Sequence, residues 1–190
     1  MKIIAITGGI GSGKSVVCKI LKASGFAVYD SDERAKYITA ISSEVKYKLQ
    51  SILGENIYIN GSLNKKMLSD FLFASAENTK IINSIIHPAV KDDFKEWCLQ
   101  QNSEFVFIES AILFESGFDK LVDEIWCVTA SENVRVARVM ARNGMSAEEV
   151  RSRIKSQMSD SERESRSDYI IDNDGKSSVL KQLEKILGYI

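Results

Sequence analysis

The chain has 190 residues, of which 44% are hydrophobic and 27% charged, and its formal net charge is −1. This length predicts one domain with room for an inserted subdomain, and a charge so close to zero argues against nucleic acid or an anionic membrane as a partner. No apolar run approaches the roughly 18 residues of a membrane span. The three cysteines, Cys18, Cys98 and Cys127, form no zinc pattern and indicate a reduced, cytoplasmic setting.

The hydrophobic pattern predicts strands that alternate with helices. An apolar run at 2–7 ends in glycines and predicts a buried strand, and residues 14–24 predict a helix with an apolar face. Further strands are predicted at 26–30, 104–109, 123–130 and 167–172. Such alternation favours crossover connections and an α/β fold, with a mostly parallel sheet covered by helices on both faces.

The stretch 32–102 breaks this alternation. Helical patterns recur within it at 44–53, 65–74 and 78–101. Because one helix normally suffices for a crossover connection, we expect a mostly helical insertion here. The remaining core would comprise about 1–31, 103–141 and 167–190. Outside this core, the segment 142–166 is polar and rich in arginine, which favours a mobile lid over a core element.

The loop between the first predicted strand and helix has a recognisable motif. Residues 8–15, GGIGSGKS, fit the pattern G-x-x-x-x-G-K-[ST] of a loop that wraps the phosphates of a nucleoside triphosphate. Its glycines let successive N–H groups form a nest for anionic oxygens, beside the positive end of the next helix. Lys14 would reach the β- and γ-phosphates, and the hydroxyl of Ser15 would coordinate Mg²⁺. We expect ATP to contact Gly9, Gly11, Ser12, Gly13, Lys14, Ser15 and Val16.

Other nucleotide-binding classes fit this loop less well. A dinucleotide fingerprint, G-x-G-x-x-G, requires glycine at Lys14 when counted from Gly9, or at Val16 when counted from Gly11. The sequence also lacks the N-K-x-D element with which switch GTPases read their base. A short chain with a helical insertion and a lid fits a small-molecule kinase, which must exclude water from its site.

Arginine is concentrated in one part of the chain, since seven of the eight arginines lie between residues 135 and 166. The guanidinium group suits phosphate oxygens, but acidic residues alternate with these arginines, so a solvated helix face is the alternative for each one. Arg138 and Arg142 are four residues apart and share a helix face. We expect at least one of them to contact ATP.

Two carboxylates, Asp30 and Asp32, follow the second predicted strand, at the edge where parallel sheets bind ligands. Two residues apart in an extended chain, they would point the same way. One could then accept the proton of an attacking hydroxyl while the other caps the next helix. Capping alone is the alternative for either residue.

Together with segments farther along, these motifs resemble the dephospho-CoA kinase family, which transfers the γ-phosphate of ATP to the 3′-hydroxyl of dephospho-CoA in the last step of coenzyme A synthesis. The segments are TGGIGSGKS, VYDSDERAKYI, GSLNKKML, IIHPAV, AILFESG, RVARVMARNGMSAEEVRSRIKSQ and DYIIDNDG. The resemblance implies a three-layer P-loop NTPase fold, an acceptor-binding insertion, and ATP and Mg²⁺ as cofactors. A kinase for another small acceptor, such as a nucleoside monophosphate, and a nucleotide-binding module without transfer activity are the alternatives.

The resemblance also implies roles for single residues. Asp32 matches the family's proposed general base, while Lys14 and Ser15 match its phosphate and metal ligands. His87 matches the histidine of a His-Pro pair near the acceptor site; a helix-start residue before a proline is the alternative. Glu109 stands where many members have an aspartate, and it would hold a Mg²⁺-bound water or serve a structural purpose.

Several positions depart from the family pattern. Lys65 and Lys66 stand where arginine is usual, so the acceptor contact expected of Lys65 would lack the bidentate fork. Val16 replaces a threonine, Ala111 a proline and Arg135 a common glutamine. None of these changes removes a catalytic group, so they affect the details of acceptor binding more than the reaction.

Overall fold

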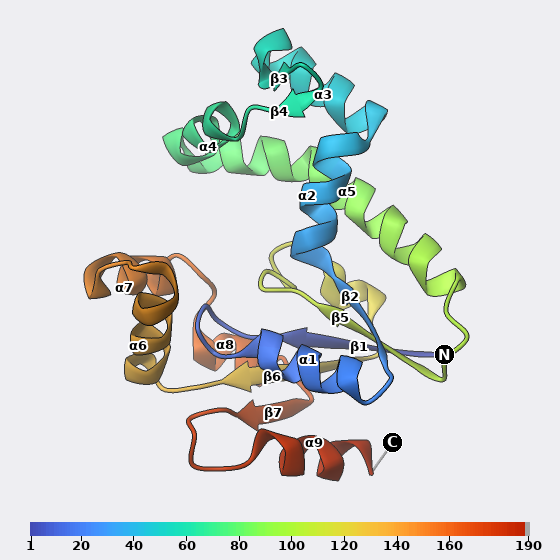
Figure 1. The fold of residues 1–190 in the computed structure, drawn as a ribbon, viewed down its shortest axis with the longest axis vertical. Coiled ribbons are helices and arrows are strands. Elements are labelled where there is room, and N and C mark those ends of the chain that lie inside the picture. The colour runs from blue at the N-terminus through green and yellow to red at the C-terminus, as the bar shows by residue number, and fades with distance from the viewer. Residues whose placement is uncertain (189–190) are drawn as a thin grey trace. The chain divides into compact units, whose positions relative to one another are not determined.

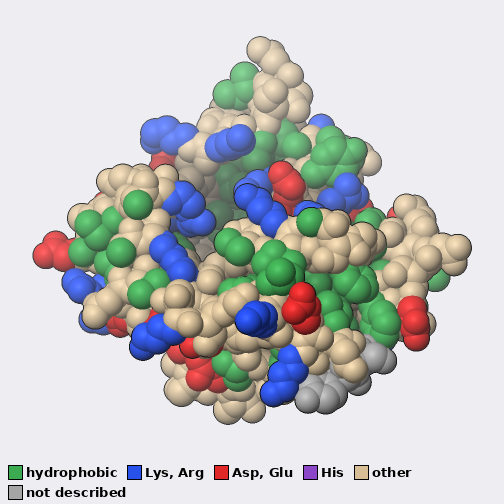
Figure 2. Space-filling model, turned by 60° about the horizontal axis from the view of Figure 1, so that its bottom comes forward, with side chains coloured by type: hydrophobic (Ala, Val, Ile, Leu, Met, Phe, Trp, Pro, Cys, Tyr) green, Lys and Arg blue, Asp and Glu red, His purple; other side chains and the backbone are tan. Residues whose placement is uncertain are grey.

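The computed structural model describes residues 1–188. The chain divides into two compact units, and each is described by itself. Unit 1 comprises Met1–Asp30 together with Gln101–Ile190, and unit 2 comprises Ser31–Gln100. No helix within the described residues is both long and apolar enough to cross a lipid bilayer. On the face shown in Figure 2, Lys and Arg side chains are spread over the surface with Asp and Glu among them, as the near-zero net charge suggests.

Unit 1 is built on a five-stranded parallel sheet with the strand order β2-β5-β1-β6-β7 (Figure 1). The strands are β1 Lys2–Thr7, β2 Ala27–Asp30, β5 Phe105–Glu109, β6 Glu124–Thr129 and β7 Tyr169–Asp172. All five were expected from the sequence, with ends that shift by one or two residues. The register places Ile6 beside Glu109, and Asp30 beside Glu109 on the other side.

Helices cover both faces of this sheet. They are α1 Lys14–Ala23, α6 Glu132–Asn143, α7 Ala147–Lys155, α8 Asp160–Ser165 and α9 Val179–Leu187. Trp126 and Val128 of β6 pack in the cluster formed with α1 and α9, whereas α8 contacts β6 on the side of Cys127. The three-layer α/β fold predicted from the sequence is therefore confirmed. The helix α9 was not among the predicted elements.

One core cluster of unit 1 lies between the sheet and the helices α1 and α9. Its buried members are Ile4, Ile6, Val17, Cys18, Leu21, Phe107, Trp126, Val128, Ile171, Leu183 and Ile186. The rings of Phe107 and Trp126 meet edge to face at 5.5 Å between centroids. Because central parallel strands are buried on both faces, their sequences read as continuous apolar runs rather than as alternating patterns.

The arginine-rich segment 142–166 contains residues with core positions, which the polar pattern did not predict. The helix α7 begins with a capping box, in which Ser146 and Glu149 bond each other's main-chain N–H groups. Val150 of α7 is fully buried against Val136 and Val139 of α6. Arg163 of α8 is only 1% exposed. Val150 and Arg163 are therefore core residues within a segment whose role as a mobile lid stays a prediction.

Unit 2 is mostly helical, with α2 Ser31–Ile41, α3 Ser43–Leu53, α4 Lys65–Ala74 and α5 Ala76–Leu99. The helices α2, α3 and α4 all pack against the long helix α5, which buries Ile82, Val90 and Phe94. The sequence did not predict the short hairpin of β3 Tyr58–Ile59 and β4 Ser62–Leu63. Its turn is formed by Asn60 and Gly61, both at positive φ. Strands of two residues are too short to show an alternating pattern.

Candidate functional site

The phosphate loop, residues 8–15, joins the end of β1 to the start of α1. Gly13 precedes α1 with a φ of 102°, a left-handed conformation that favours glycine, and it has no side chain to cap the helix. A Cβ at this position would also collide with the side-chain amide of Asn173. The positive end of α1 is thus left uncapped by a side chain and is suited to an anion.

Lys14 folds back over the phosphate loop. Its Nζ atom donates a hydrogen bond to the carbonyl oxygen of Gly8 at 2.8 Å, which closes the loop at its first residue. Ser15 and Val16 follow in the first turn of α1 and are exposed. The loop therefore brings an ammonium group, a hydroxyl and main-chain N–H groups together, which is the set that binds and neutralises a polyphosphate.

Arg138 lies beside the phosphate loop, but in this structure its guanidinium group bonds main-chain oxygens. Its Nη1 donates to the carbonyl oxygen of Ser12 at 3.3 Å, and its Nη2 to that of Asn173 at 2.7 Å. The Nδ2 atom of Asn173 donates to the same oxygen of Ser12 at 2.8 Å. Arg142, one turn farther along α6, is exposed, and its Nε donates to Oδ1 of Asn143 at 2.8 Å.

Three loop-supporting residues were not assigned this function from the sequence. Gln157 and Asn173 stood in segments that resemble the family, and Arg135 was noted as a departure from its pattern. In the structure Gln157 accepts the N–H of Ile10, Arg135 donates to the oxygen of Ile10, and Asn173 donates to Ser12. The family resemblance of those segments was the only hint in the sequence that these residues support the loop. A side chain that bonds a distant main-chain atom produces no recognisable spacing of residues in the sequence.

Glu109 ends β5 at the carboxyl edge of the sheet, next to the buried thiol of Cys18. Burial raises the pKa of this thiol far above its ordinary range, and the neighbouring charge of Glu109 and a hydrogen bond to it act in the same direction. The thiol therefore stays protonated and donates to the carboxylate. No group of three or more His, Cys, Asp or Glu side chains within residues 1–188 is arranged to hold a metal ion. The assignment of Ser15 and Glu109 as single oxygen ligands for Mg²⁺ stays a prediction.

Asp32 lies in the first turn of α2, because that helix begins at Ser31, directly after the last residue of β2. The expectation that Asp30 and Asp32 lie two apart in an extended chain is wrong, and so is the N-cap position for Asp32. A carboxylate in the first turn is nevertheless favoured by the helix dipole. The side chain of Asp32 is exposed.

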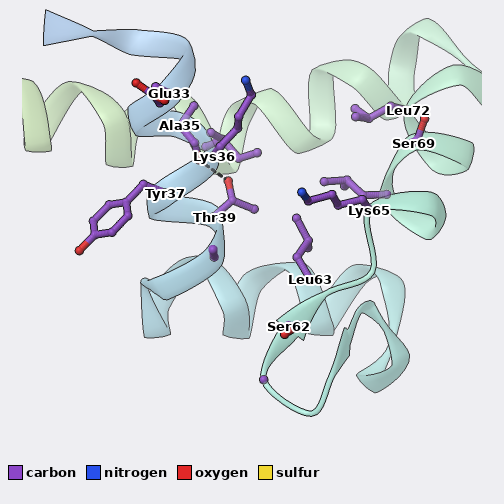
Figure 3. A pocket seen from close by; sticks show the side chains of 14 residues that line it. Glu33, Ala35, Lys36, Tyr37, Thr39, Ser62, Leu63, Lys65, Ser69 and Leu72 are labelled. Atoms are coloured by element: carbon purple, nitrogen blue, oxygen red, sulfur yellow. Dashed lines mark hydrogen bonds between the residues drawn. The ribbon is translucent and has the colours of Figure 1, made fainter.

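A hollow of about 940 Å³ in unit 2, here called the α2–α4 hollow, lies between α2, the β3–β4 hairpin and α4. Figure 3 shows Leu63 pointing into it, and the side chain of Lys65 reaching across it from α4 toward α2. Lys36 contributes a second amine and Glu33 a carboxylate, while Leu68, Leu72 and Ile86 contribute apolar wall. The hollow thus combines cationic groups with an apolar lining, so it suits a ligand that is partly anionic and partly apolar.

His87 lies in the middle of α5, whose range includes Pro88, so its interpretation as a helix-start residue is wrong. His87 is half-buried. It does not line the α2–α4 hollow, although the neighbouring residue Ile86 does. Burial lowers the pKa of His87, and the nearby Lys91 lowers it further. The imidazole is therefore neutral near pH 7 and can exchange hydrogen bonds without offering a positive charge.

Comparison with known proteins gives matches over nearly the whole chain. A family model described as dephospho-CoA kinase matches residues 2–178. A Bacteroides fragilis protein named dephospho-CoA kinase is 41% identical over 188 residues, which are 98% of this chain and 92% of that protein. A crystal structure of a Thermus thermophilus protein is 31% identical with a TM-score of 0.84, covering 100% of this chain and 97% of the other. A dephospho-CoA kinase structure from Campylobacter jejuni is 24% identical with a TM-score of 0.72 and covers 100% of both chains, a likeness that concerns the fold.

Proposed function

The chain belongs to the dephospho-CoA kinase family, and we propose that it transfers the γ-phosphate of ATP to the ribose 3′-hydroxyl of dephospho-CoA, which gives coenzyme A. The proposal places this reaction, the last step of coenzyme A biosynthesis, in the cytoplasm. The observation that supports it most directly is the phosphate loop, where Lys14 bonds Gly8 and Gly13 leaves the start of α1 without a side-chain cap.

ATP is proposed to bind along residues 9–16. Main-chain N–H groups of the loop and the positive end of α1 would hold the phosphate oxygens, and the ammonium of Lys14 would offset the charge that develops on the transferred group. Arg138 already lies at Ser12, and Arg142 shares its helix, so either could add a guanidinium contact to the nucleotide. Residues 142–166 would act as a lid that excludes water from the reaction.

The chain also offers oxygen ligands that fit Mg²⁺. The hydroxyl of Ser15 would bind the ion, and the carboxylate of Glu109 would hold one of its waters, since Mg²⁺ usually keeps several waters and takes few protein ligands. When bound, the ion would neutralise negative charge on the phosphates of ATP. The protonated thiol of Cys18 donates a hydrogen bond to the carboxylate of Glu109.

Acceptor binding is proposed for unit 2. Dephospho-CoA carries phosphates and a long, mostly uncharged arm, and the α2–α4 hollow pairs the amines of Lys36 and Lys65 with apolar wall. Lys65 would contact an anionic group of the acceptor, and the neutral His87 would give or take a hydrogen bond. Asp32 would orient the 3′-hydroxyl and take its proton as general base.

The proposal is tested by incubating the purified protein with ATP, Mg²⁺ and dephospho-CoA and measuring the mass of the acceptor. We expect dephospho-CoA to gain one phosphoryl group while ADP forms in equal amount. Adenosine and uridine monophosphates serve as control acceptors. ADP formation that depends on a monophosphate, or ATP binding without any acceptor phosphorylated, would overturn the assignment of the acceptor or of the transfer itself.

A further inference from the structure

The tip of the phosphate loop is held from outside by two side chains that have no role in the proposed transfer step. The N–H of Ile10 donates to Oε1 of Gln157 at 2.9 Å, and the carbonyl oxygen of Ile10 accepts from Nε of Arg135 at 2.9 Å. Arg135 belongs to α6, and Gln157 follows α7. Both main-chain polar groups of one loop residue are thus fixed by side chains from the second half of the chain.

Arg135 is itself held by an ion-pair cluster, the Arg135–Asp160–Arg163 cluster, in which the two arginine side chains are buried and the Asp160 side chain is 44% exposed. Nη1 of Arg135 pairs with Oδ2 of Asp160, and Oδ1 of the same carboxylate accepts from Nη1 of Arg163 at 2.9 Å. The two arginine side chains are 2% and 1% exposed, and Nη2 of Arg163 also donates to the oxygen of Met158 at 2.9 Å. A charge buried this deeply is costly unless it is paired, so the cluster stabilises one orientation of Arg135.

Arg135 also packs against the glycines of the loop. A Cβ added to Gly9 would lie 2.5 Å from Nη2 of Arg135, and one added to Gly11 would lie 2.7 Å from the carbonyl oxygen of Arg135. Both distances are shorter than non-bonded contacts allow. Glycine is therefore required at Gly11 by the main chain of α6, and at Gly9 a side chain would displace the guanidinium group of Arg135.

We propose that Arg135 is a positioning residue for ATP, acting through the main chain of Ile10 and kept in place by Asp160 and Arg163. A loop so rich in glycine has many accessible conformations, and a nest binds phosphate well only when its N–H groups are already aligned. An apolar side chain at 135 would fill the same space without fixing the oxygen of Ile10. The inference rests on the proposed function, because it assumes that the loop holds ATP.

The test compares the affinity for MgATP, titrated in the absence of acceptor, in the variants Arg135→Leu, Arg135→Gln and Asp160→Asn. We expect Arg135→Leu and Asp160→Asn to raise Kd for ATP about tenfold, as the loss of a hydrogen bond to a charged group would. Arg135→Gln keeps an N–H donor and should lose less affinity than Arg135→Leu. In turnover assays, KM for ATP should rise while KM for dephospho-CoA stays unchanged.

The matched control is Lys2→Gln, which removes the ion pair between Lys2 and Glu124, at the opposite end of β1 from the phosphate loop. The Lys2→Gln variant should have a lower unfolding temperature and an unchanged Kd for ATP.

If Arg135→Leu fails to fold, the test rests on the near-isosteric variant Asp160→Asn. An unchanged Kd for ATP in Asp160→Asn, or an equal rise of KM for both substrates, would mean that the cluster only stabilises the fold and does not position the loop for ATP. ATP binding without phosphorylation of dephospho-CoA would refute the proposed function alone, and no ATP binding by the wild-type protein would refute both.

Discussion

The phosphate loop of unit 1 and the α2–α4 hollow of unit 2 are built in opposite ways. The loop is one continuous stretch of eight residues, 8–15, that acts mainly through its main chain and one lysine. The hollow is assembled from α2, a hairpin and α4, with a wall residue from α5, and it acts through side chains. In the proposed function, phosphate is recognised by backbone conformation, and the acceptor by packing and two amines.

This difference has a consequence for mutation. In the loop, a single side chain carries most of the positive charge, so its removal should affect both binding and rate. In the hollow, several side chains are proposed to contact the acceptor. Removing any one of them should therefore have a smaller effect, limited to KM for dephospho-CoA.

Lys14→Ala removes the ammonium group of the phosphate loop. We expect kcat/KM to fall about 10³-fold and Kd for ATP to rise, because this group is proposed to offset charge in both the bound ATP and the transition state. Calorimetric titration and a coupled ADP assay measure the two quantities. Lys19→Ala, on the exposed side of the same helix, is the control. Normal ATP binding together with normal turnover in Lys14→Ala would refute the assignment of the loop.

Asp32→Asn removes the proposed general base and keeps the shape of the side chain. We expect kcat to fall about 10²-fold, the scale of general base catalysis, while Kd for ATP is unchanged. A flattened dependence of kcat on pH would support the same conclusion. If turnover is unchanged in Asp32→Asn, Asp32 takes no part in the catalytic step. Its carboxylate would then only stabilise the first turn of α2 through the helix dipole.

Lys65→Ala tests the α2–α4 hollow, and Lys66→Ala provides a close control. Lys65 lines the hollow, whereas the side chain of Lys66 is 85% exposed and pairs with Asp70 at 2.7 Å. We expect Lys65→Ala to raise KM for dephospho-CoA about tenfold through the loss of one charged hydrogen bond, with KM for ATP unchanged. Lys66→Ala should change neither constant. Equal effects of the two variants would mean that overall charge, rather than the hollow, decides acceptor affinity.

The smallest effect concerns stability and the chain's one histidine. Because the pKa of His87 in the folded protein lies below its ordinary value of 6.5, the unfolded chain binds more protons just below that pH. The free energy of unfolding should therefore decrease as pH falls through about 6.5 toward the folded-state pKa. Denaturant unfolding at one pH above 6.5 and one below it measures this change in the free energy of unfolding. His87→Gln should reduce this dependence, and an unchanged dependence would assign it to other groups.

The elements of unit 1 were largely predictable because their signals are local. The strand–loop–helix from 2 to 23 follows from an apolar run, a glycine-rich motif and a helical face, all within about twenty residues. The hairpin at 58–63 was missed because each strand has two residues. Val150 and Arg163 were taken as parts of a polar segment, since nothing nearby in the sequence showed that they are buried.

Local sequence signals were enough to predict the phosphate loop, the parallel sheet and the family, because φ and ψ preferences and hydrophobic periodicity act over neighbouring residues. The surroundings of the loop depend instead on contacts between distant parts of the chain. Arg135 and Gln157 reach Ile10 across 125 and 147 positions of sequence, and Asp160 joins Arg135 to Arg163 from α8. Such contacts arise when helices pack and bury their polar groups, so the identity of a side chain cannot specify its partner until the fold has brought the two together.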